Sequence, residues 1–202
     1  MIRHTLPLLA AATALLLAAC ASAPMHYYTL LPAAAAAPAS PAAAIPFELL
    51  PVGVPAQVDQ PQLVVRQGGQ SVALLEGQRW IAPLADEVRG ALAADLAQAL
   101  PGRDVGGLAS GDKPLLQARV DLRRFDSEPG SYALIEAAWS VRLRHGDKPV
   151  SQACTSRIRE TVGPGYDALV QGHQRALGEL ADQIAVVGRA LESGQPASCP
   201  AG

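Results

Sequence analysis

The sequence predicts a two-layer α+β domain, in which two long helices pack on one face of a mostly antiparallel sheet. Two observations lead to this prediction. Apolar residues recur at helical spacing over 83–100 and again over 166–191. Between these helical stretches, three segments alternate apolar and polar residues, as strands with one buried and one solvated face do.

The first half of the domain begins near Phe47 and is predicted to form strands before its helix, over 48–54, 62–66 and 72–75. Gly68 and Gly69 separate the last two strands, which predicts a hairpin. In the helix that follows, Pro83 suits the first turn, where no amide donor is needed. Pro101 and Gly102 end the helix.

The second half is predicted to be a three-stranded meander followed by the last helix, with strands over 116–123, 135–143 and 150–162. Pro129–Gly130 and Gly146–Asp147 provide the turns between these strands. The polar face of the meander is rich in arginine, as a sheet covered on one side only requires. The last helix covers the other face.

The chain opens with a predicted signal peptide over residues 1–19, which has a basic start and an apolar run too short to span a bilayer. The run ends in Leu-Ala-Ala-Cys, which resembles the bacterial lipobox and implies cleavage before Cys20 and acylation of that residue. Several acyl chains would anchor the protein stably. The alternative is an ordinary signal peptide with an incidental Cys20. Ala21 favours the outer membrane, with the domain facing the periplasm, because enterobacterial lipoproteins retained at the inner membrane carry Asp there.

Residues 20–46 form a predicted lipidated N-terminus with the β-prone stretch Tyr27-Tyr28-Thr29-Leu30 and a Pro/Ala-rich linker. The tyrosine stretch has two interpretations. It is part of a loose tether, or it is a strand that docks on the domain and leaves the Pro/Ala segment as a surface loop. We favour docking. Residues 47–202 are predicted to form a single domain.

The composition excludes several classes of partner and site. The net charge of −2 gives no electrostatic reason to expect nucleic acid binding. In an oxidising compartment Cys154 and Cys199 are expected to pair as a disulfide, and two separate buried thiols are the alternative. No second apolar run reaches membrane-spanning length.

No constellation of catalytic residues is found in the sequence. The three histidines after the signal peptide, His26, His145 and His173, have neither metal-ligand spacing nor a nucleophile motif beside them. His173 falls near the apolar stripe of the last helix, which favours a structural role. We therefore expect no enzyme activity, no metal and no cofactor.

An ordered set of short motifs resembles the ABC-type transport auxiliary lipoprotein family (PqiC/YmbA-like). The set comprises the lipobox, Tyr28-Thr29-Leu30, Val52-Gly-Val-Pro55, Val58 to Arg66, Arg79-Trp80-Ile-Ala-Pro83-Leu84, Asp95 to Leu100, Val120 to Phe125 and Ala138-Trp139. This resemblance spans nearly all of the mature chain. It implies a non-enzymatic, periplasm-facing lipoprotein of an intermembrane lipid-transport system.

In such a system the lipoprotein is expected to hold an MCE-domain protein, which forms a tube across the periplasm, near the outer membrane. The residues expected to bind this partner are Asp59, Gln62, Arg66, Arg79 and Trp80. The alternative for this stretch is a buried strand with a structural turn. Homo-oligomerisation is plausible because MCE assemblies are symmetric. Two other functions remain open: a lipid-binding carrier and a structural lipoprotein of envelope assembly.

Overall fold

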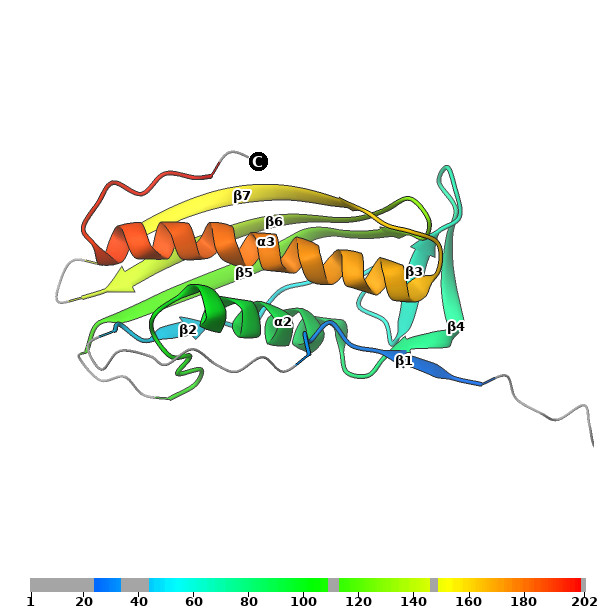
Figure 1. Ribbon diagram of the computed structural model, residues 1–202, viewed down its shortest axis with the longest axis horizontal. Helices are drawn as coiled ribbons and strands as arrows, with labels where there is room; N and C mark the ends of the chain where they lie inside the picture. Colours follow the sequence, from blue (N-terminus) through cyan, green and yellow to red (C-terminus); the bar gives the residue numbers. More distant parts are fainter. Residues whose placement is uncertain (1–23, 34–43, 109–112, 146–148, 201–202) are drawn as a thin grey trace, which may run out of the picture.

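The computed structural model describes residues 24–33, 44–108, 113–145 and 149–200. The predicted signal peptide, Cys20, Ala21 and most of the Pro/Ala segment lie outside these residues. The described residues form seven strands and two helices: β1 His26–Tyr28, β2 Phe47–Leu49, β3 Gln62–Arg66, β4 Val72–Trp80, α2 Leu84–Ala99, β5 Leu115–Glu128, β6 Tyr132–Arg144, β7 Val150–Thr161 and α3 Tyr166–Glu192 (Figure 1).

The strands divide into two sheets with the orders β1-β4-β3 and β2-β5-β6-β7. Strands β1 and β4 pair in parallel, as do β2 and β5, and the remaining pairs are antiparallel. The predicted α+β class is confirmed, with the hairpin β3–β4 and the meander β5–β6–β7. The pairing of β1 with β4 corresponds to the docked-strand interpretation of the tyrosine stretch.

The division into two sheets was not predicted. Its cause lies at the edge of β5 that does not pair with β6. Strand β2 pairs with β5 from Leu116 to Ala118, and Gly53 forms a further bridge to Asp121. This stretch of the edge is therefore occupied. The β3–β4 hairpin instead packs beside the later part of β5, past an irregularity in register between Leu122 and Arg124.

Two strands differ in length from their predictions. The first spans only Phe47–Leu49 instead of 48–54, because Pro51 and Pro55 have no amide hydrogen to donate to a ladder. Strand β4 continues to Trp80 instead of ending at residue 75. Its second part is polar, and it is held by β1, which pairs with it from Gln78 to Trp80.

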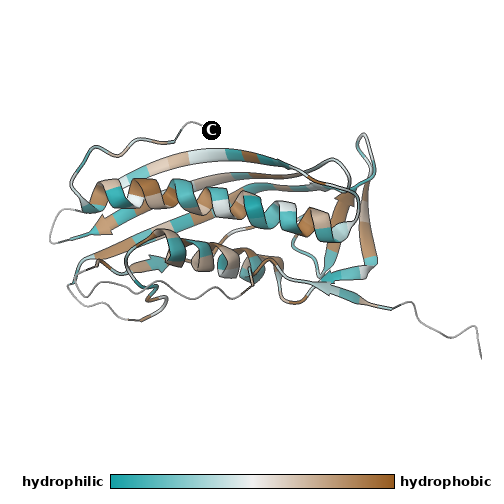
Figure 2. Ribbon diagram, in the orientation of Figure 1, coloured by the Kyte–Doolittle hydropathy of each residue, from teal (hydrophilic) through white to brown (hydrophobic). Residues whose placement is uncertain are grey.

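The two helices lie side by side on the same face of the four-stranded sheet (Figure 1). Helix α3 is amphipathic, and polar and apolar residues alternate around it in Figure 2. It approaches the sheet closely at two glycines. A Cβ on Gly188 would lie 2.8 Å from Leu116 Cδ2, and a Cβ on Gly172 would clash with Val162. Only glycine allows this spacing.

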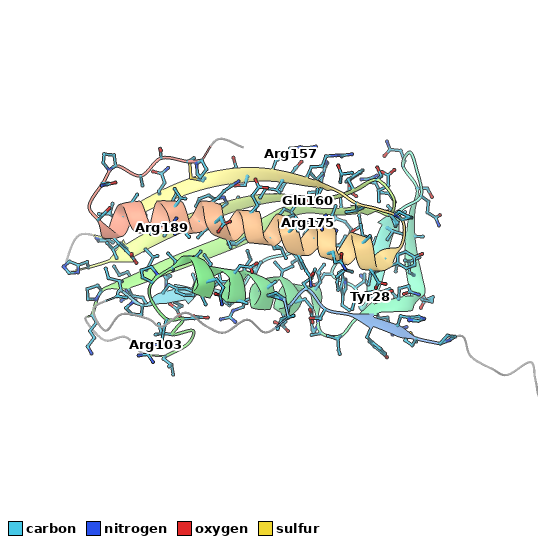
Figure 3. All side chains as sticks on the ribbon, in the orientation of Figure 1. Tyr28, Arg103, Arg157, Glu160, Arg175 and Arg189 are labelled. Carbon is cyan, nitrogen blue, oxygen red and sulfur yellow. A yellow bond between two sulfur atoms is a disulfide. The ribbon has the colours of Figure 1, made fainter. Side chains whose placement is uncertain are left out.

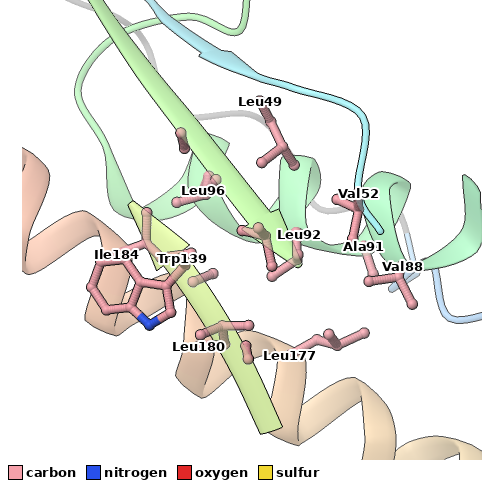
Figure 4. Packing of buried hydrophobic residues seen from close by; sticks show 14 of the residues in the cluster. Leu49, Val52, Val88, Ala91, Leu92, Leu96, Trp139, Leu177, Leu180 and Ile184 are labelled. Carbon is pink, nitrogen blue, oxygen red and sulfur yellow. The ribbon is translucent and has the colours of Figure 1, made fainter. Parts of the chain in front are cut away.

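A large core fills the space between the helices and the sheet, and a smaller apolar cluster contains Val65, Ala133, Val162 and Leu169. In Figure 4 the side chains of α2 and α3 meet around Trp139 of β6; they are Leu92, Leu96, Leu177, Leu180 and Ile184. The indole Nε1 of Trp139 donates to Ser156 Oγ at 2.8 Å, and Ser156 Oγ donates to Gln183 Oε1. These three buried polar side chains are thus paired with one another.

The chain that leaves β1 is fastened to α2 by a buried carboxylate. Glu87 is 2% exposed, and its Oε2 accepts hydrogen bonds of 2.7 Å from the backbone N–H of Leu30 and from Thr29 Oγ1. Leu30 itself is fully buried. The position of Glu87 near the helix N-terminus also suits a negative charge. The N-terminal segment is therefore built into the core.

We expect Glu87→Ala to lower the free energy of unfolding by about 2 kcal/mol, because the buried Leu30 amide loses its acceptor. The chain ahead of α2 should also become more sensitive to protease. Denaturant unfolding and limited proteolysis measure these effects. The control is Asp86→Ala, which removes an exposed carboxylate in the same turn and should cost less than about 1 kcal/mol. Equal losses for the two variants would contradict this role for Glu87.

Candidate partner-binding surface

The residues predicted to bind a partner lie on the three-stranded sheet and the loop before it, where they fall into two groups. The first group links this sheet to the rest of the domain. Arg66 Nε lies 2.6 Å from Asp126 Oδ1 and 2.7 Å from Oδ2, which joins β3 to β5. This contact raises the pKa of the Arg66 guanidinium, through the hydrogen bond and the charge of Asp126.

Trp80 also belongs to the first group. Its side chain is 6% exposed, and its ring packs edge-on against Phe125, with ring centroids 6.2 Å apart and an interplanar angle of 78°. Edge-to-face packing of this kind stabilises aromatic pairs. Trp80 therefore contributes to the core, and its side chain has little surface to offer a partner.

The second group is accessible. Asp59 is exposed in the loop before β3. Gln62 Nε2 donates to Glu76 Oε2 at 3.1 Å, and Arg79 Nη2 lies 3.5 Å from the same oxygen. Gln62, Glu76 and Arg79 thus form a polar cluster across β3 and β4. Sequence analysis did not identify Glu76 or Asp126, because opposing residues are fixed by strand register and not by sequence spacing.

A buried histidine lies behind this sheet. His173 is fully buried, its ring stacks on Phe125 at 3.8 Å between centroids, and its Nε2 shares a hydrogen bond of 2.8 Å with Ser127 Oγ. Burial lowers the pKa of His173 to about 3. Its Nδ1 has no hydrogen-bond partner among the described residues. These contacts agree with the structural role expected of this histidine.

The shifted pKa of His173 predicts a pH-dependent stability. Below pH 6.5 this histidine is protonated in the unfolded chain but not in the folded chain. The free energy of unfolding therefore decreases as the pH is lowered, down to about pH 3. We expect a loss of about 2 kcal/mol between pH 7 and pH 5 from this group. Denaturant titrations at both pH values measure it. His173→Phe, which cannot titrate, should lose this part of the pH dependence, and an unchanged dependence would contradict the assignment.

Cys154 of β7 and Cys199 of the C-terminal tail form a disulfide, with Cα atoms 5.5 Å apart. The bond joins residues 45 positions apart in sequence and fixes the tail that follows α3 beside β7. The Sγ of Cys199 also lies 3.2 Å from the carbonyl oxygen of Ala153. A segment that follows the last helix is thereby held at an edge of the four-stranded sheet.

Removal of this disulfide should lower the free energy of unfolding by roughly 2–4 kcal/mol, because the unfolded chain regains the freedom of the closed loop. The Cys154→Ala/Cys199→Ala variant tests this by denaturant unfolding. Dithiothreitol should destabilise the wild-type protein by a similar amount and leave the double variant unchanged. A dithiothreitol effect of equal size on both proteins would contradict the prediction.

The described residues show neither a metal site nor a membrane-crossing helix. They contain no group of three or more His, Cys, Asp or Glu side chains that could hold a metal ion. In the same part of the chain, no helix combines the length and the apolar character needed to cross a bilayer.

An apolar cavity lies where the two sheets meet α3, lined by Leu63, Trp80, Phe125, Val170 and their neighbours. Its volume of about 10 Å³ is close to the minimum needed for one water molecule. An acyl chain cannot enter it. The lipid-carrier alternative therefore gains no support from this part of the core.

Comparisons with known proteins agree with the fold. A structure of an uncharacterized protein has a TM-score of 0.59 and 20% sequence identity, with 81% of this chain and 97% of that chain covered. A structure of a protein from Xanthomonas campestris has a TM-score of 0.54 and 14% identity, with 86% and 100% covered. At these identities the two likenesses show the fold alone. The search of curated proteins gave no match.

The family model described as "ABC-type transport auxiliary lipoprotein component" matches residues 28–185. This range starts at the last residue of β1 and ends within α3, so it includes strands β2 to β7, α2 and most of α3. The match therefore covers well over half of the sequence. The chain belongs to the family of ABC-type transport auxiliary lipoprotein components.

Proposed function

We propose that the protein is a non-enzymatic lipoprotein, anchored in the outer membrane through acylated Cys20, that docks the periplasmic MCE-domain protein of an intermembrane lipid-transport system. The observation that carries the proposal is the family match over residues 28–185, which follows directly on a lipobox at residues 17–20. The family description supplies the transport role. The lipid, the MCE-domain partner and the choice of membrane are our extension of it.

The position of β1 supports a domain held close to the bilayer. His26, the first residue of β1, is only six positions after Cys20, so the chain between them reaches at most about 20 Å. Strand β1 is paired with β4, and the chain just after it is fixed by the hydrogen bond from the Leu30 N–H to Glu87. The tether from anchor to domain is therefore this short stretch, and the Pro/Ala segment follows β1 in the chain.

Exposed apolar side chains around β1 also favour a position near the membrane. Met25 and Tyr27 are exposed, and so is Ile81, whose backbone N–H donates to the carbonyl of Tyr28 at 2.9 Å. Tyrosine is favoured at the level of lipid head groups, and exposed apolar side chains gain by burial at the boundary with the acyl chains. In this arrangement β1 faces the bilayer, and Arg79, which pairs with Tyr27 in the β1–β4 register, lies at the border between the bilayer and the partner-binding surface proposed below.

We propose that Asp59, Gln62 and Arg79 contact the MCE-domain partner, with Arg66 and Trp80 holding the strands that present them. Asp59 is exposed, and Gln62 and Arg79 are half-buried. The ion pair of Arg79 with Glu76 is at the surface and contributes little to stability, so both groups can turn to a partner. Several copies of the lipoprotein around a symmetric MCE tube would form a ring.

A pull-down of the full-length lipoprotein from detergent-solubilised membranes, followed by mass spectrometry of proteins and lipids, tests the proposal. We expect an MCE-domain protein to be recovered with it. Cys20→Ser should move the protein from the membrane fraction to the soluble fraction, because the acyl chains supply the membrane affinity. Separation of the two membranes by density should place the wild-type protein in the outer membrane.

The outcomes separate the alternatives. Stoichiometric lipid without an MCE-domain protein would favour the carrier function and contradict docking. Recovery of other envelope proteins alone would favour a structural lipoprotein. Asp59→Lys and Arg79→Glu should weaken recovery of the MCE-domain protein, whereas Asp182→Lys on the exposed side of α3 should not. Unchanged recovery with Asp59→Lys and Arg79→Glu would contradict this docking surface.

A further inference from the structure

The face of the four-stranded sheet that the helices leave open carries a groove of about 790 Å³. Three neighbouring strands and the C-terminal tail line it. Strand β5 contributes Arg119, Asp121 and Arg123, and the tail contributes Cys199 and Pro200. The groove therefore crosses the middle of the sheet from β5 to the edge at β7.

The register of the strands explains why the sheet is hollow here. Two neighbouring rows across β6 and β7 pair Ser140 with Ala153 and Ala138 with Thr155, which are all small side chains. The next row on one side pairs Gln117 with Arg142, and the next row on the other side pairs Glu136 with Arg157. Long side chains therefore flank a floor of small ones.

The tail forms the end of the groove at β7. The disulfide to Cys154 holds Cys199 in this place, so Pro200 also lies against the groove. A tail fixed only by α3 would have no such constraint, since the residues after Gly194 have no regular structure. The covalent bond thus keeps the shape of the groove fixed before anything binds.

The charge around the groove is positive, whereas the net charge of the whole chain is −2. Arg123 pairs with Asp121 at 3.1 Å, and Arg124 and Arg157 share Glu136. The exposed Arg119 and Arg142 have no carboxylate within ion-pair distance among the described residues. Glu48 of β2, which accepts a hydrogen bond from Gln117, is a third carboxylate in the flanking row. Five arginines thus face three carboxylates on this part of the sheet.

We infer that this groove binds an acidic segment of a protein partner, whose carboxylates pair with Arg119 and Arg123. Guanidinium groups bind carboxylates through two parallel hydrogen bonds, and a positive hollow concentrates negative charge. The floor holds hydroxyl groups from Ser140 and Thr155, which does not suit an acyl chain. A bilayer surface is flat and does not enter a groove that the tail closes at one end.

The inference rests on the proposed function for the identity of the partner, which is the MCE-domain protein. Binding of this protein to the full-length lipoprotein in detergent is the first test. Arg119→Glu/Arg123→Glu should weaken binding about tenfold or more, because the complementary charges become repulsive. Arg103→Glu is the control: it is exposed, and Figure 3 places it across the molecule from Arg157 of β7. It should change binding less than twofold.

Thermal unfolding of each variant shows whether it is folded, and Arg119→Gln provides a milder change at the same site. Weaker binding by the folded double variant and by Arg119→Gln, with Arg103→Glu unaffected, supports the inference. Unchanged binding by both groove variants overturns it and leaves the proposed function standing. Equal weakening by Arg103→Glu also overturns it, because the effect would then come from net charge.

Photo-crosslinking from within the groove is the second test, and it does not depend on the partner assumed. A photoreactive amino acid replaces Ala153 on the groove floor, and the control position is Val186, which is half exposed on α3. A crosslink from Ala153 alone to a sequenced, carboxylate-rich segment of another protein supports the inference, even if the MCE-domain protein does not bind. Crosslinks to lipid, to a second copy of this chain or to nothing overturn it.

Discussion

The close approach of α3 to the meander is the constraint on which the rest of the structure depends. The inner face of β5–β6–β7 is mostly apolar and needs one long cover. Helix α3 provides it because glycine and alanine occupy the contact positions, among them Gly172, Ala176 and Gly188. Helix α2 packs beside α3, and its Leu92 and Leu96 are buried in the core that the two helices share.

Much of this arrangement follows from sequence periodicity. The alternation around Val120 and Val141 and the helical spacing around Leu92 and Leu180 depend on neighbours a few residues away, and they predicted the meander and both helices. The split into two sheets depends on which part of the outer edge of β5 is already paired with β2. Such pairings are made by residues far apart in the chain, so no local pattern contains them.

The contacts of single surface side chains also cannot be predicted from local sequence patterns. Arg66 and Arg79 have similar neighbours in the sequence, since each stands between an apolar residue and a glutamine. In the structure Arg66 binds both oxygens of Asp126, whereas Arg79 makes a longer surface contact with Glu76. Glu87 likewise suits a helix N-terminus by its position alone, and only the path of Leu30 gives it a buried hydrogen bond.

The two faces of the four-stranded sheet are subject to different demands. The inner face is fully used by packing, so changes there affect stability before they affect any partner. The open face needs only to remain soluble, and any mixture of polar side chains would do that. A hollow of small residues lies between rows of long ones, beside two arginines that have no ion-pair partner among the described residues, and a disulfide fixes the tail at its end. This shape exceeds that need. Because solubility does not require this shape, a binding role is the simpler account of it.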